Sequence, residues 1–285
     1  ILAKERHFAR AAALCHVTQP TLSMGLVSLE EALGGIRLVE RDRRFLGLTA
    51  EGQAVLPWAK AVIADLDSLR AAVLPGAGGL TGELRLGLVP AAAPVSGGLV
   101  KALVTEHPNM SVALRSMTSE EIATALQAHE LDAGLTYLSH EPPRQMRQVP
   151  LHRETYLFAT RADGPLGNQR RIEWDDALSQ PLVLLNQTMQ NRRILDAFVA
   201  SRGLALQPVI TADSYPMLLS MVASGGFSTV VTDSFAPFMP DVGGIRMIPF
   251  ADPPPPNELG LVIPDRPQLA PLAEAIFSVA QRQAM

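Results

Sequence analysis

The chain has 285 residues and a formal net charge of −4, and this length fits two or three compact units. Hydrophobic residues make up 47% of the sequence and charged residues 18%. Such a chain can bury large cores, which excludes a disordered or fibrous protein. No apolar run reaches the ~18 residues that a membrane-spanning helix needs. The single cysteine, Cys15, cannot form an internal disulfide, which fits a reducing compartment such as the cytoplasm.

Charge is distributed unevenly along the chain. Residues 1–60 hold 8 Lys and Arg against 6 Asp and Glu, so this segment carries +2 and the remainder carries −6. A mildly basic head on an acidic body hints at nucleic-acid contact at one end. Residues 1–10 are charged where a secretion signal would be apolar, so we expect no signal peptide.

The first 35 residues predict two helices joined by a tight turn. A short Ala-rich helix covers 8–15, and Thr18 can cap the next helix because its hydroxyl accepts a hydrogen bond from a first-turn N–H. Pro20 is tolerated in the first helical turn. Leucines then recur at positions 22, 26, 29 and 33, which predicts one buried face. The Arg-rich segment 37–48 reads as a small β-hairpin, or wing.

The outer face of the second helix is suited to reading DNA. A reading helix needs an inner face that packs on its neighbour and an outer face that reaches base edges. Gln can pair with adenine, Ser and Thr can reach bases or phosphates, and methyl groups can contact thymine. The candidate DNA-binding residues are Thr18, Gln19, Pro20, Thr21, Ser23, Met24 and Val27 on the helix, with Arg41, Arg43 and Arg44 in the wing. The alternative is a three-helix domain whose polar turn and arginines are only solvated.

A third, long helix is predicted from Thr49, which can cap it, to about residue 74. Its apolar residues are spaced like a coiled-coil seam, and Pro57 should bend it. A lone amphipathic helix between domains must bury its apolar stripe, and a second copy of the helix is the simplest cover. The candidate dimerisation residues are Val55, Trp58, Val62, Leu66 and Leu69.

From residue 83 the pattern changes to alternating strands and helices. The predicted strands are 83–89, 111–115, 131–137, 154–160, 182–186, 208–212, 227–232, 245–250 and 258–263. The predicted helices are 93–106, 118–128, 188–202, 214–224 and 267–283. Apolar strands interleaved with helices predict parallel sheets covered on both faces, and about 200 residues of this pattern fit two similar α/β lobes.

Catalytic chemistry finds little support in the sequence. It contains no G-x-S-x-G, no H-E-x-x-H, no P-loop and no cysteine pair. The six histidines are scattered without ligand spacing. We therefore expect no enzyme activity, no metal site and no cofactor.

Five segments of the first 52 residues together resemble the winged helix-turn-helix of LysR-type transcriptional regulators. They are FARAA at 8–12, HVTQPTLS at 16–23, LEEALG at 29–34, LVER at 38–41 and LTAEG at 48–52. The resemblance extends along the whole chain. It implies an α/β protein with a mainly helical winged helix-turn-helix head at 1–50 and a linker and dimerisation helix at 51–75. It also implies an effector-binding domain at 83–285, shaped like type 2 periplasmic solute-binding proteins.

The resemblance further implies two Rossmann-like lobes, with lobe I at 83–159 and 264–285 and lobe II at 160–263. The implied function is a bacterial regulator that binds promoter DNA, assembles from homodimers to a homotetramer, and responds to a small, often anionic metabolite. One departure lies in the reading helix, where Met24, Gly25 and Val27 stand in place of polar or basic residues. Base reading is then narrower and more apolar, and Gly25 weakens the helix by ~1 kcal/mol relative to Ala.

Regulators of this family place their ligand between the lobes, where free N–H groups at helix N-termini favour anions. The candidate effector-binding residues are Ala91, Ala92, Ser119, Thr136, Tyr137, Asn186, Gln187, Thr188 and Ser214. Arg192 and Arg193 could add charge, or belong to a solvated helix face. We expect lobe closure to turn about two crossings, near 159–160 and 263–264.

Two other classes of protein compete with the regulator. A solute-binding protein of a transporter would need a signal peptide or lipid anchor. An enzyme on a two-lobed α/β scaffold would need a convergent acid, base or nucleophile set. Salt-dependent retention on duplex DNA would distinguish the regulator from both.

Overall fold

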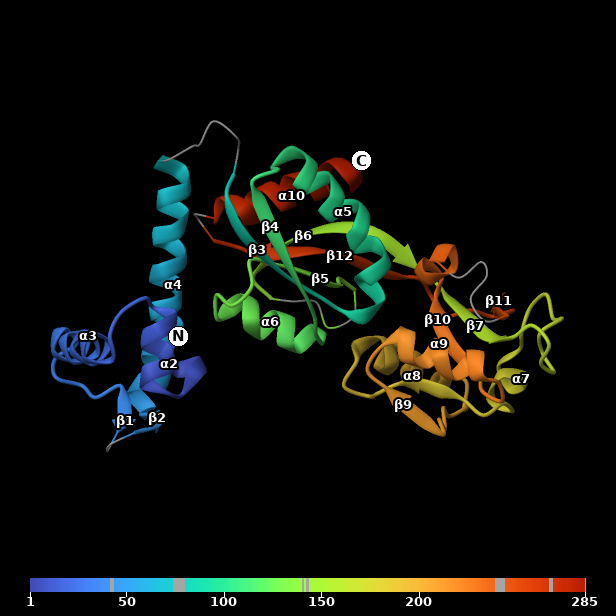
Figure 1. The fold of residues 1–285 in the computed structure, drawn as a ribbon. Helices are drawn as coiled ribbons and strands as arrows, with labels where there is room; N and C mark the ends of the chain where they lie inside the picture. Colours follow the sequence, from blue (N-terminus) through green and yellow to red (C-terminus); the bar gives the residue numbers. More distant parts are fainter. Residues whose placement is uncertain are drawn as a thin grey trace. The chain divides into compact units, whose positions relative to one another are not determined.

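The computed structural model describes residues 1–41, 44–73, 80–139, 141, 144–238, 244–266 and 269–284. The chain divides into two compact units, Ile1–Leu66 and Asp67–Met285, which we call the head unit and the effector unit. Figure 1 labels their helices and strands. None of the described helices is long and apolar enough to cross a membrane.

The head unit is helical apart from one small hairpin. Its elements are α1 (Leu2–Glu5), α2 (Phe8–Leu14), α3 (Gln19–Ala32), β1 (Val39–Arg41), β2 (Phe45–Leu48) and α4 (Ala50–Val73), the last of which continues into the effector unit. The Thr18 hydroxyl accepts a hydrogen bond from the Thr21 N–H at 3.4 Å, so the predicted cap of α3 is confirmed. The predicted wing and long helix are confirmed as well, whereas α1 was not predicted.

The buried face of α3 is shorter than its leucine spacing predicts. Leu22 and Leu26 are half-buried, but Leu29 is 45% and Leu33 39% exposed. The reason is length: α2 has 7 residues and α3 has 14, so α2 can cover only about half of α3. The far end of α3 is instead fixed by the buried Glu30, whose carboxylate accepts a hydrogen bond from the Leu38 N–H at 2.9 Å.

Thr49 and Gly52 lock the wing onto the start of α4. The Thr49 hydroxyl donates to the Arg37 carbonyl at 2.6 Å and accepts from the Gly52 N–H at 2.9 Å. A Cβ on Gly52 would lie 2.0 Å from the Leu38 carbonyl oxygen, so only glycine fits here.

The described residues of the effector unit form three sheets. A five-stranded sheet has the order β4 (Met110–Ser116), β3 (Gly82–Leu88), β5 (Ala133–Tyr137), β12 (Asn257–Pro264), β6 (Met146–Glu154). A three-stranded sheet has the order β10 (Thr229–Thr232), β7 (Tyr156–Arg161), β11 (Ile245–Pro249). The strands β8 (Val183–Leu185) and β9 (Ile210–Ala212) form a pair.

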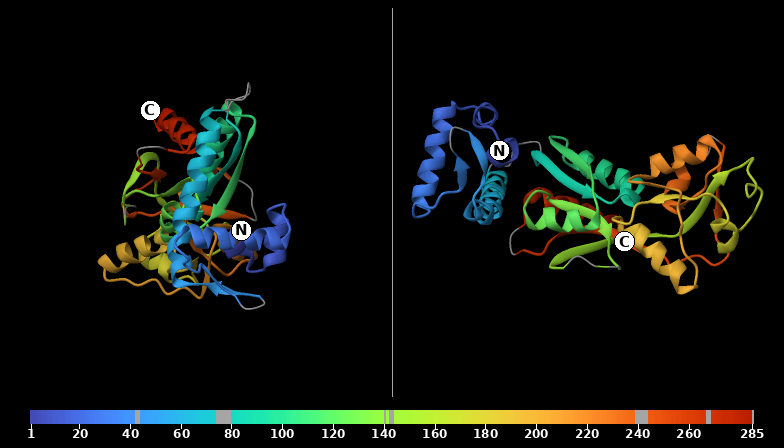
Figure 2. Two further views of the ribbon diagram at one scale, coloured as in Figure 1. Left: turned by 90° about the vertical axis from the view of Figure 1, so that its left-hand side faces the viewer. Right: turned by 90° about the horizontal axis from the view of Figure 1, so that it is seen from below.

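Helices cover these sheets. In the first lobe they are η1 (Pro90–Ala92), α5 (Ala93–Glu106), α6 (Ser119–Gln127) and α10 (Pro271–Ala284). In the second lobe they are α7 (Trp174–Leu178), α8 (Gln190–Ser201), α9 (Tyr215–Ser224) and η2 (Asp233–Phe238). Helices α5 and α10 lie together on one side of the five-stranded sheet and α6 lies on the other (Figure 1), and Figure 2 shows the same layering from two further directions.

The prediction of parallel sheets is confirmed for some strand pairs and wrong for others. The pairs β3–β4, β3–β5 and β8–β9 are parallel, but β12 runs antiparallel to β5 and β6, and β7 runs antiparallel to β10 and β11. Strand β6 was not predicted as a strand of its own, because it mixes polar residues with Pro150. Its place at the sheet edge tolerates that proline, which pairs with Gly260 beside a register shift in β12.

The predicted lobe crossings, near 159–160 and 263–264, are also misplaced. The predicted strand 154–160 is divided at Thr155, because Glu154 ends β6 in the five-stranded sheet and Tyr156 begins β7 in the three-stranded sheet. The predicted strand 258–263 lies in β12 and therefore belongs to the five-stranded sheet. Sheet membership assigns β7 to β11 to lobe II, with crossings at Thr155 and at 250–256.

Candidate DNA interface and effector cleft

The start of α3 presents most of the candidate DNA-binding residues to solvent. Thr18, Gln19, Pro20 and Thr21 are exposed, as are Met24 at 65% and Val27 at 39%, whereas Ser23 is half-buried. The hydroxyl groups of Thr18 and Thr21 hydrogen-bond to each other at 2.8 Å. Gln19 and Met24 therefore offer the outward-facing polar and apolar groups, and their contact with bases stays a prediction.

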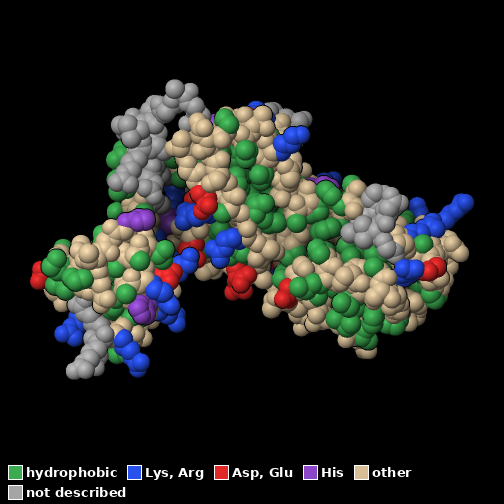
Figure 3. Space-filling model, in the orientation of Figure 1, with side chains coloured by type: hydrophobic (Ala, Val, Ile, Leu, Met, Phe, Trp, Pro, Cys, Tyr) green, Lys and Arg blue, Asp and Glu red, His purple; other side chains and the backbone are tan. Residues whose placement is uncertain are grey.

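The wing is the β1–β2 hairpin, with Val39 opposite Leu48 and Glu40 opposite Gly47. Arg44 is exposed beside it. The predictions for Arg43 and for the side chain of Arg41 lie outside the described residues. The head unit carries Lys and Arg side chains on the face seen in Figure 3, as a surface that meets phosphates requires.

The described side chains of the apolar stripe on α4 are largely exposed. Trp58 is 76% exposed, Val62 66%, Leu66 44% and Leu69 58%, and Val55 is half-buried. Apolar side chains in a continuous exposed row are typical of an interface with another molecule.

A small cavity lies between the two lobes of the effector unit. It has a volume of about 10 Å³, which is room for roughly one water molecule. Its lining comes from both lobes and consists of Val89, Pro90, Ala91, Thr118, Ser119, Tyr137, Leu185, Met189, Gln190 and Asn191. We call this cavity with its lining the effector cleft. It lies where strands end and helices begin, the expected ligand position in α/β folds.

Ser119 contributes a free hydroxyl to the effector cleft. The cap of α6 is made by its neighbours, because the Thr118 hydroxyl accepts from the Glu121 N–H and the Glu121 carboxylate accepts from the Thr118 N–H. The Ser119 hydroxyl is buried and has no hydrogen-bond partner among the described residues. It is therefore available to a ligand.

The predicted effector-binding residues divide into two groups. Ala91, Ser119 and Tyr137 line the effector cleft. Ala92 and Thr136 are buried and do not line it. Asn186, Gln187, Thr188 and Ser214 lie outside the lining too.

The local structure explains why the second group misses the cleft. The Asn186 side chain bonds to Asp213, and its carbonyl oxygen accepts from the Thr188 N–H at 3.0 Å and from the Thr188 hydroxyl. Helix α8 begins at Gln190, two residues after the predicted start. Gln190 and Asn191 therefore occupy the lining, and sequence reasoning missed them.

Arg192 and Arg193 are both engaged in contacts within the chain. Arg192 is only 3% exposed, and it donates to the Leu185 carbonyl at 2.9 Å and to Asp196 at 2.8 Å. A solvated position is therefore wrong for Arg192. Arg193 pairs with Glu141 at 2.5 Å and donates to the Thr188 carbonyl at 2.8 Å.

Behind the cleft wall lies a buried carboxyl group that the sequence did not single out. The Tyr137 hydroxyl donates to Glu154 Oε1 at 2.7 Å, and the Asn191 amide donates to the Tyr137 oxygen at 2.7 Å and to Glu154 Oε1 at 3.2 Å. Glu154 is fully buried, and burial raises its pKa to about 8.

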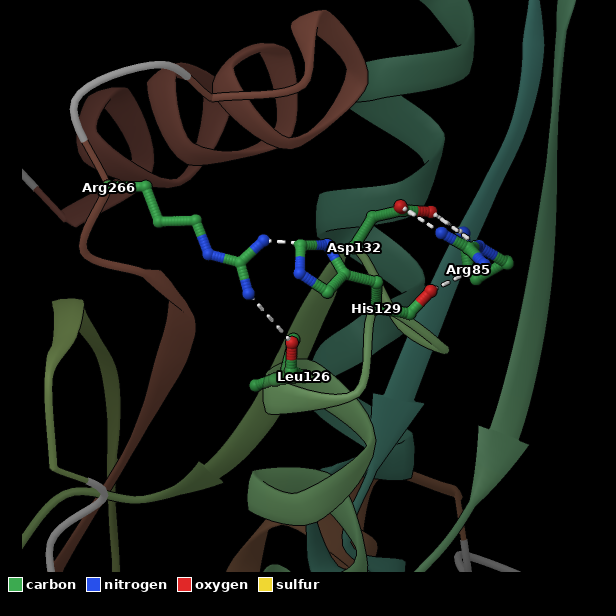
Figure 4. A network of polar contacts seen from close by, with 5 residues as sticks. All are labelled: Arg85, Leu126, His129, Asp132 and Arg266. Carbon is green, nitrogen blue, oxygen red and sulfur yellow. Dashed lines mark hydrogen bonds and ion pairs between the residues drawn. The ribbon is translucent and has the colours of Figure 1, made fainter. Parts of the chain in front are cut away.

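A polar network closes the opposite end of lobe I (Figure 4). Arg85 pairs with Asp132 at 2.6 Å and donates to the His129 carbonyl, while Arg266 contacts His129 Nδ1 at 2.7 Å. Arg266 also donates to the Leu126 carbonyl near the end of α6. These contacts tie α6 to β3 and to the segment before α10, so we read the network as structural. Over the described ranges, no group of three or more His, Cys, Asp or Glu side chains could hold a metal ion.

A larger hollow of about 510 Å³ lies beside α5, α9 and η2. It is lined by Ala93, Pro94, Gly97, Pro216, Leu219, Ser220, Ala223, Phe235 and Phe238. Its one hydroxyl, on Ser220, already donates to the Met217 carbonyl at 2.7 Å. This lining offers little to a polar ligand, so the smaller effector cleft is the better candidate for a polar effector.

A helix-turn-helix head with an exposed reading helix, joined to a two-lobed domain with a cleft at helix N-termini, defines a ligand-responsive transcriptional regulator. The family described as "LysR substrate binding domain" matches residues 77–285, and "Bacterial regulatory helix-turn-helix protein, lysR family" matches 1–53. The chain belongs to the LysR family of transcriptional regulators. The predicted family, fold class and DNA-binding function are confirmed.

Similar proteins include regulators named for hydrogen peroxide. A Mycobacterium leprae protein, "Probable hydrogen peroxide-inducible genes activator", is 31% identical over 90% of this chain and 82% of its own length. The Escherichia coli DNA-binding transcriptional dual regulator OxyR is 29% identical over 96% of this chain and 91% of its own. A full-length OxyR variant from Pseudomonas aeruginosa has the same fold, with a TM-score of 0.75 and 24% identity over 99% of this chain and 91% of the other.

Proposed function

We propose that this regulator reads duplex promoter DNA with the start of α3, as a dimer paired through α4, and that a small anion in the effector cleft controls its activity. The observation that supports the ligand class is the convergence of two helix starts, those of α6 and α8, on one small cavity. Helix N-termini present unpaired N–H donors and a positive dipole end. The buried Ser119 hydroxyl adds a further donor.

The size of the cleft limits the effector. With a volume of about 10 Å³, it holds one water-sized group, so any larger ligand requires the lobes to part. A carboxylate of a few atoms, held by backbone N–H groups and by Ser119, suits this lining. The buried position strengthens such charge-assisted hydrogen bonds.

A thiol response to hydrogen peroxide does not suit this chain, although its relatives carry that name. A thiol response to peroxide requires a cysteine thiolate that oxidises to sulfenic acid or disulfide. The sequence has one cysteine, Cys15, and residues 77–285 have none. The effector unit therefore cannot form a disulfide, and ligand binding is the mode of control that its residues support.

Dimerisation through α4 follows from the exposed stripe described above. A two-fold dimer places two copies of α3 on the half-sites of a palindromic operator. Two such dimers then form the tetramer that we infer. The protein acts by binding rather than catalysis, in the cytoplasm where its DNA target lies.

A thermal-shift screen of small carboxylates tests the effector site. The best hit should raise the Tm of the unaltered protein and raise that of Ser119→Ala by less than half as much. Ser214→Ala and Thr188→Val are matched hydroxyl deletions outside the cleft lining, and both should respond like the unaltered protein. Equal stabilisation of Ser119→Ala and the unaltered protein would remove Ser119 from the site.

A further inference from the structure

The two crossings between the lobes leave the five-stranded sheet side by side. Glu154, the last residue of β6, lies directly opposite Asn257, the first residue of β12. Between Glu154 and lobe II stands Thr155, whose N–H donates to the Asp233 carboxylate at 3.0 Å and whose carbonyl accepts from the Asp233 N–H at 3.0 Å. Any rotation of one lobe against the other therefore turns about the place where Glu154 and Asn257 are paired.

All three tyrosines of the chain surround the paired residues Glu154 and Asn257. Tyr137 comes from lobe I, and Tyr156 and Tyr215 come from lobe II; each is 1% exposed. The Tyr156 hydroxyl accepts a hydrogen bond from the Asn257 amide at 3.1 Å. We call the group the hinge cluster, which comprises Tyr137, Glu154, Tyr156, Asn191, Tyr215 and Asn257.

Glu154 is the one acidic residue of the hinge cluster, and its charge has no counter-ion. Its Oε1 atom accepts from Tyr137 and Asn191, which are both neutral donors. Its Oε2 atom is buried without a partner, and no Lys, Arg or His in the described part of the chain contacts it. A buried carboxylate without a cation is unfavourable, whereas a protonated carboxyl group is neutral.

The Glu154–Asn191 contact crosses between the lobes, because β6 belongs to lobe I and α8 to lobe II. We propose that Glu154 is a proton-operated latch, protonated while the lobes are closed and ionised when they part. The latch rests on the proposed function in one respect, which is that the two lobes move together and apart. It makes a proton a second effector of this regulator.

The direction of the pH effect follows from linkage. Burial raises the pKa of Glu154 to about 8 in the closed arrangement, from an ordinary value of 4.5. Between these values the closed form holds a proton that the open, solvated form releases, so rising pH favours opening. The closed-to-open ratio falls up to tenfold per pH unit in this window and levels off above about pH 8.

Several ionisable side chains lie close to Glu154 in the hinge cluster. The groups that face it are the three tyrosines and Asp233 from η2. Burial raises the pKa of each tyrosine well above its ordinary value, so these hydroxyls stay protonated. The His152 side chain lies 3.5 Å from Asp233.

The distance between the lobes, measured against pH without any ligand, tests the latch. In a Cys15→Ser background, spin labels at Lys101→Cys on α5 and Ala200→Cys on α8 report one distance across the lobes by double electron–electron resonance. Both positions are exposed, and excess unlabelled protein separates labels within one chain from those between copies. A long-distance population should grow from pH 6 to pH 8 by up to ~100-fold relative to the short one.

Three variants make the result specific to Glu154. Glu154→Gln keeps the shape without the titration and should hold the short distance from pH 6 to pH 9. Tyr137→Phe removes a donor that lowers the pKa of Glu154, so its transition should move to higher pH. His152→Gln should behave like the unaltered protein. An unaltered protein whose distances ignore pH, a response that survives in Glu154→Gln, or one that disappears in His152→Gln would each overturn the latch.

Discussion

The head unit carries its candidate site on the outside of a helix, whereas the effector unit encloses its own. Gln19 and Met24 on α3 are exposed, so they are free to contact DNA and contribute little to folding. Asn191 and Tyr137 in the effector cleft are buried, so the proposed ligand contacts and the packing of the fold depend on the same side chains. Changes in the head should therefore alter affinity alone, and changes around the cleft should alter affinity and stability together.

The largest effect should come from the stripe on α4. Leu66→Asp places a charge within the apolar row and should convert the dimer to a monomer. Operator affinity should then fall by more than ~100-fold, because two half-sites are no longer read together. Light scattering measures the mass. Gln53→Asp, exposed on the same helix but off the stripe, is the matched control. A monomeric unaltered protein would contradict the assignment.

Next in size is the effect of Glu154 on folding. Burial raises its pKa from 4.5 to about 8 in the folded state, so its favourable protonated form is complete below pH 4.5 and lost as pH rises towards 8. Ionisation of buried Glu154 should cost the closed form up to about 5 kcal/mol of unfolding free energy over that window, and parting of the lobes should lessen this loss. Urea unfolding of the unaltered protein and of Glu154→Gln measures this loss. Parallel pH profiles for the two proteins would show that Glu154 is not the group responsible.

Gln19→Ala should have a smaller effect that is confined to DNA. Loss of a paired hydrogen bond to a base costs about 1–3 kcal/mol at the specific site and relaxes preference at one position. Because Gln19 is exposed, the Tm should not change. Fluorescence anisotropy on a duplex selected from a random pool measures the affinity. An unchanged affinity and footprint would indicate that another face of the head unit contacts the bases.

The smallest effect belongs to the wing. Arg44→Ala should weaken binding to all duplexes about equally and reduce the slope of log affinity against log salt by about 0.9, the value for one lost phosphate contact. Titrations at several salt concentrations measure the slope. A loss that depends on the sequence of the duplex would indicate that Arg44 reads bases.

How far each unit could be predicted follows from where its contacts lie in the sequence. The head depends on local signals, such as the Thr18 cap three residues before its partner Thr21. Such signals can be recognised in the sequence without knowledge of the tertiary structure. The effector cleft depends on pairings between distant segments, since Tyr137 and Asn191 are 54 residues apart. A shift of two residues at the start of α8 exchanged Thr188 for Gln190 and Asn191 in the lining.

Strand β6 shows the same limit in the sheets. Its polar alternation and Pro150 do not resemble a buried strand, and only its edge position beside Gly260 in β12 accommodates them. Glu154 is a charged residue two positions before the start of β7, and nothing in the neighbouring sequence indicates that it is buried. The proposed latch depends on contacts among β5, β6, α8 and α9, and these contacts cannot be predicted from any one of the segments.

We expect a ligand in the effector cleft to control the DNA affinity of the head. The most direct measurement is the affinity for the selected duplex, with and without a saturating amount of the best carboxylate, in the unaltered protein and in Ser119→Ala. The affinity should change about fivefold or more in the unaltered protein and little in Ser119→Ala at the same ligand concentration. An unaltered affinity in the saturated wild-type protein, or the same change in both proteins, would contradict it.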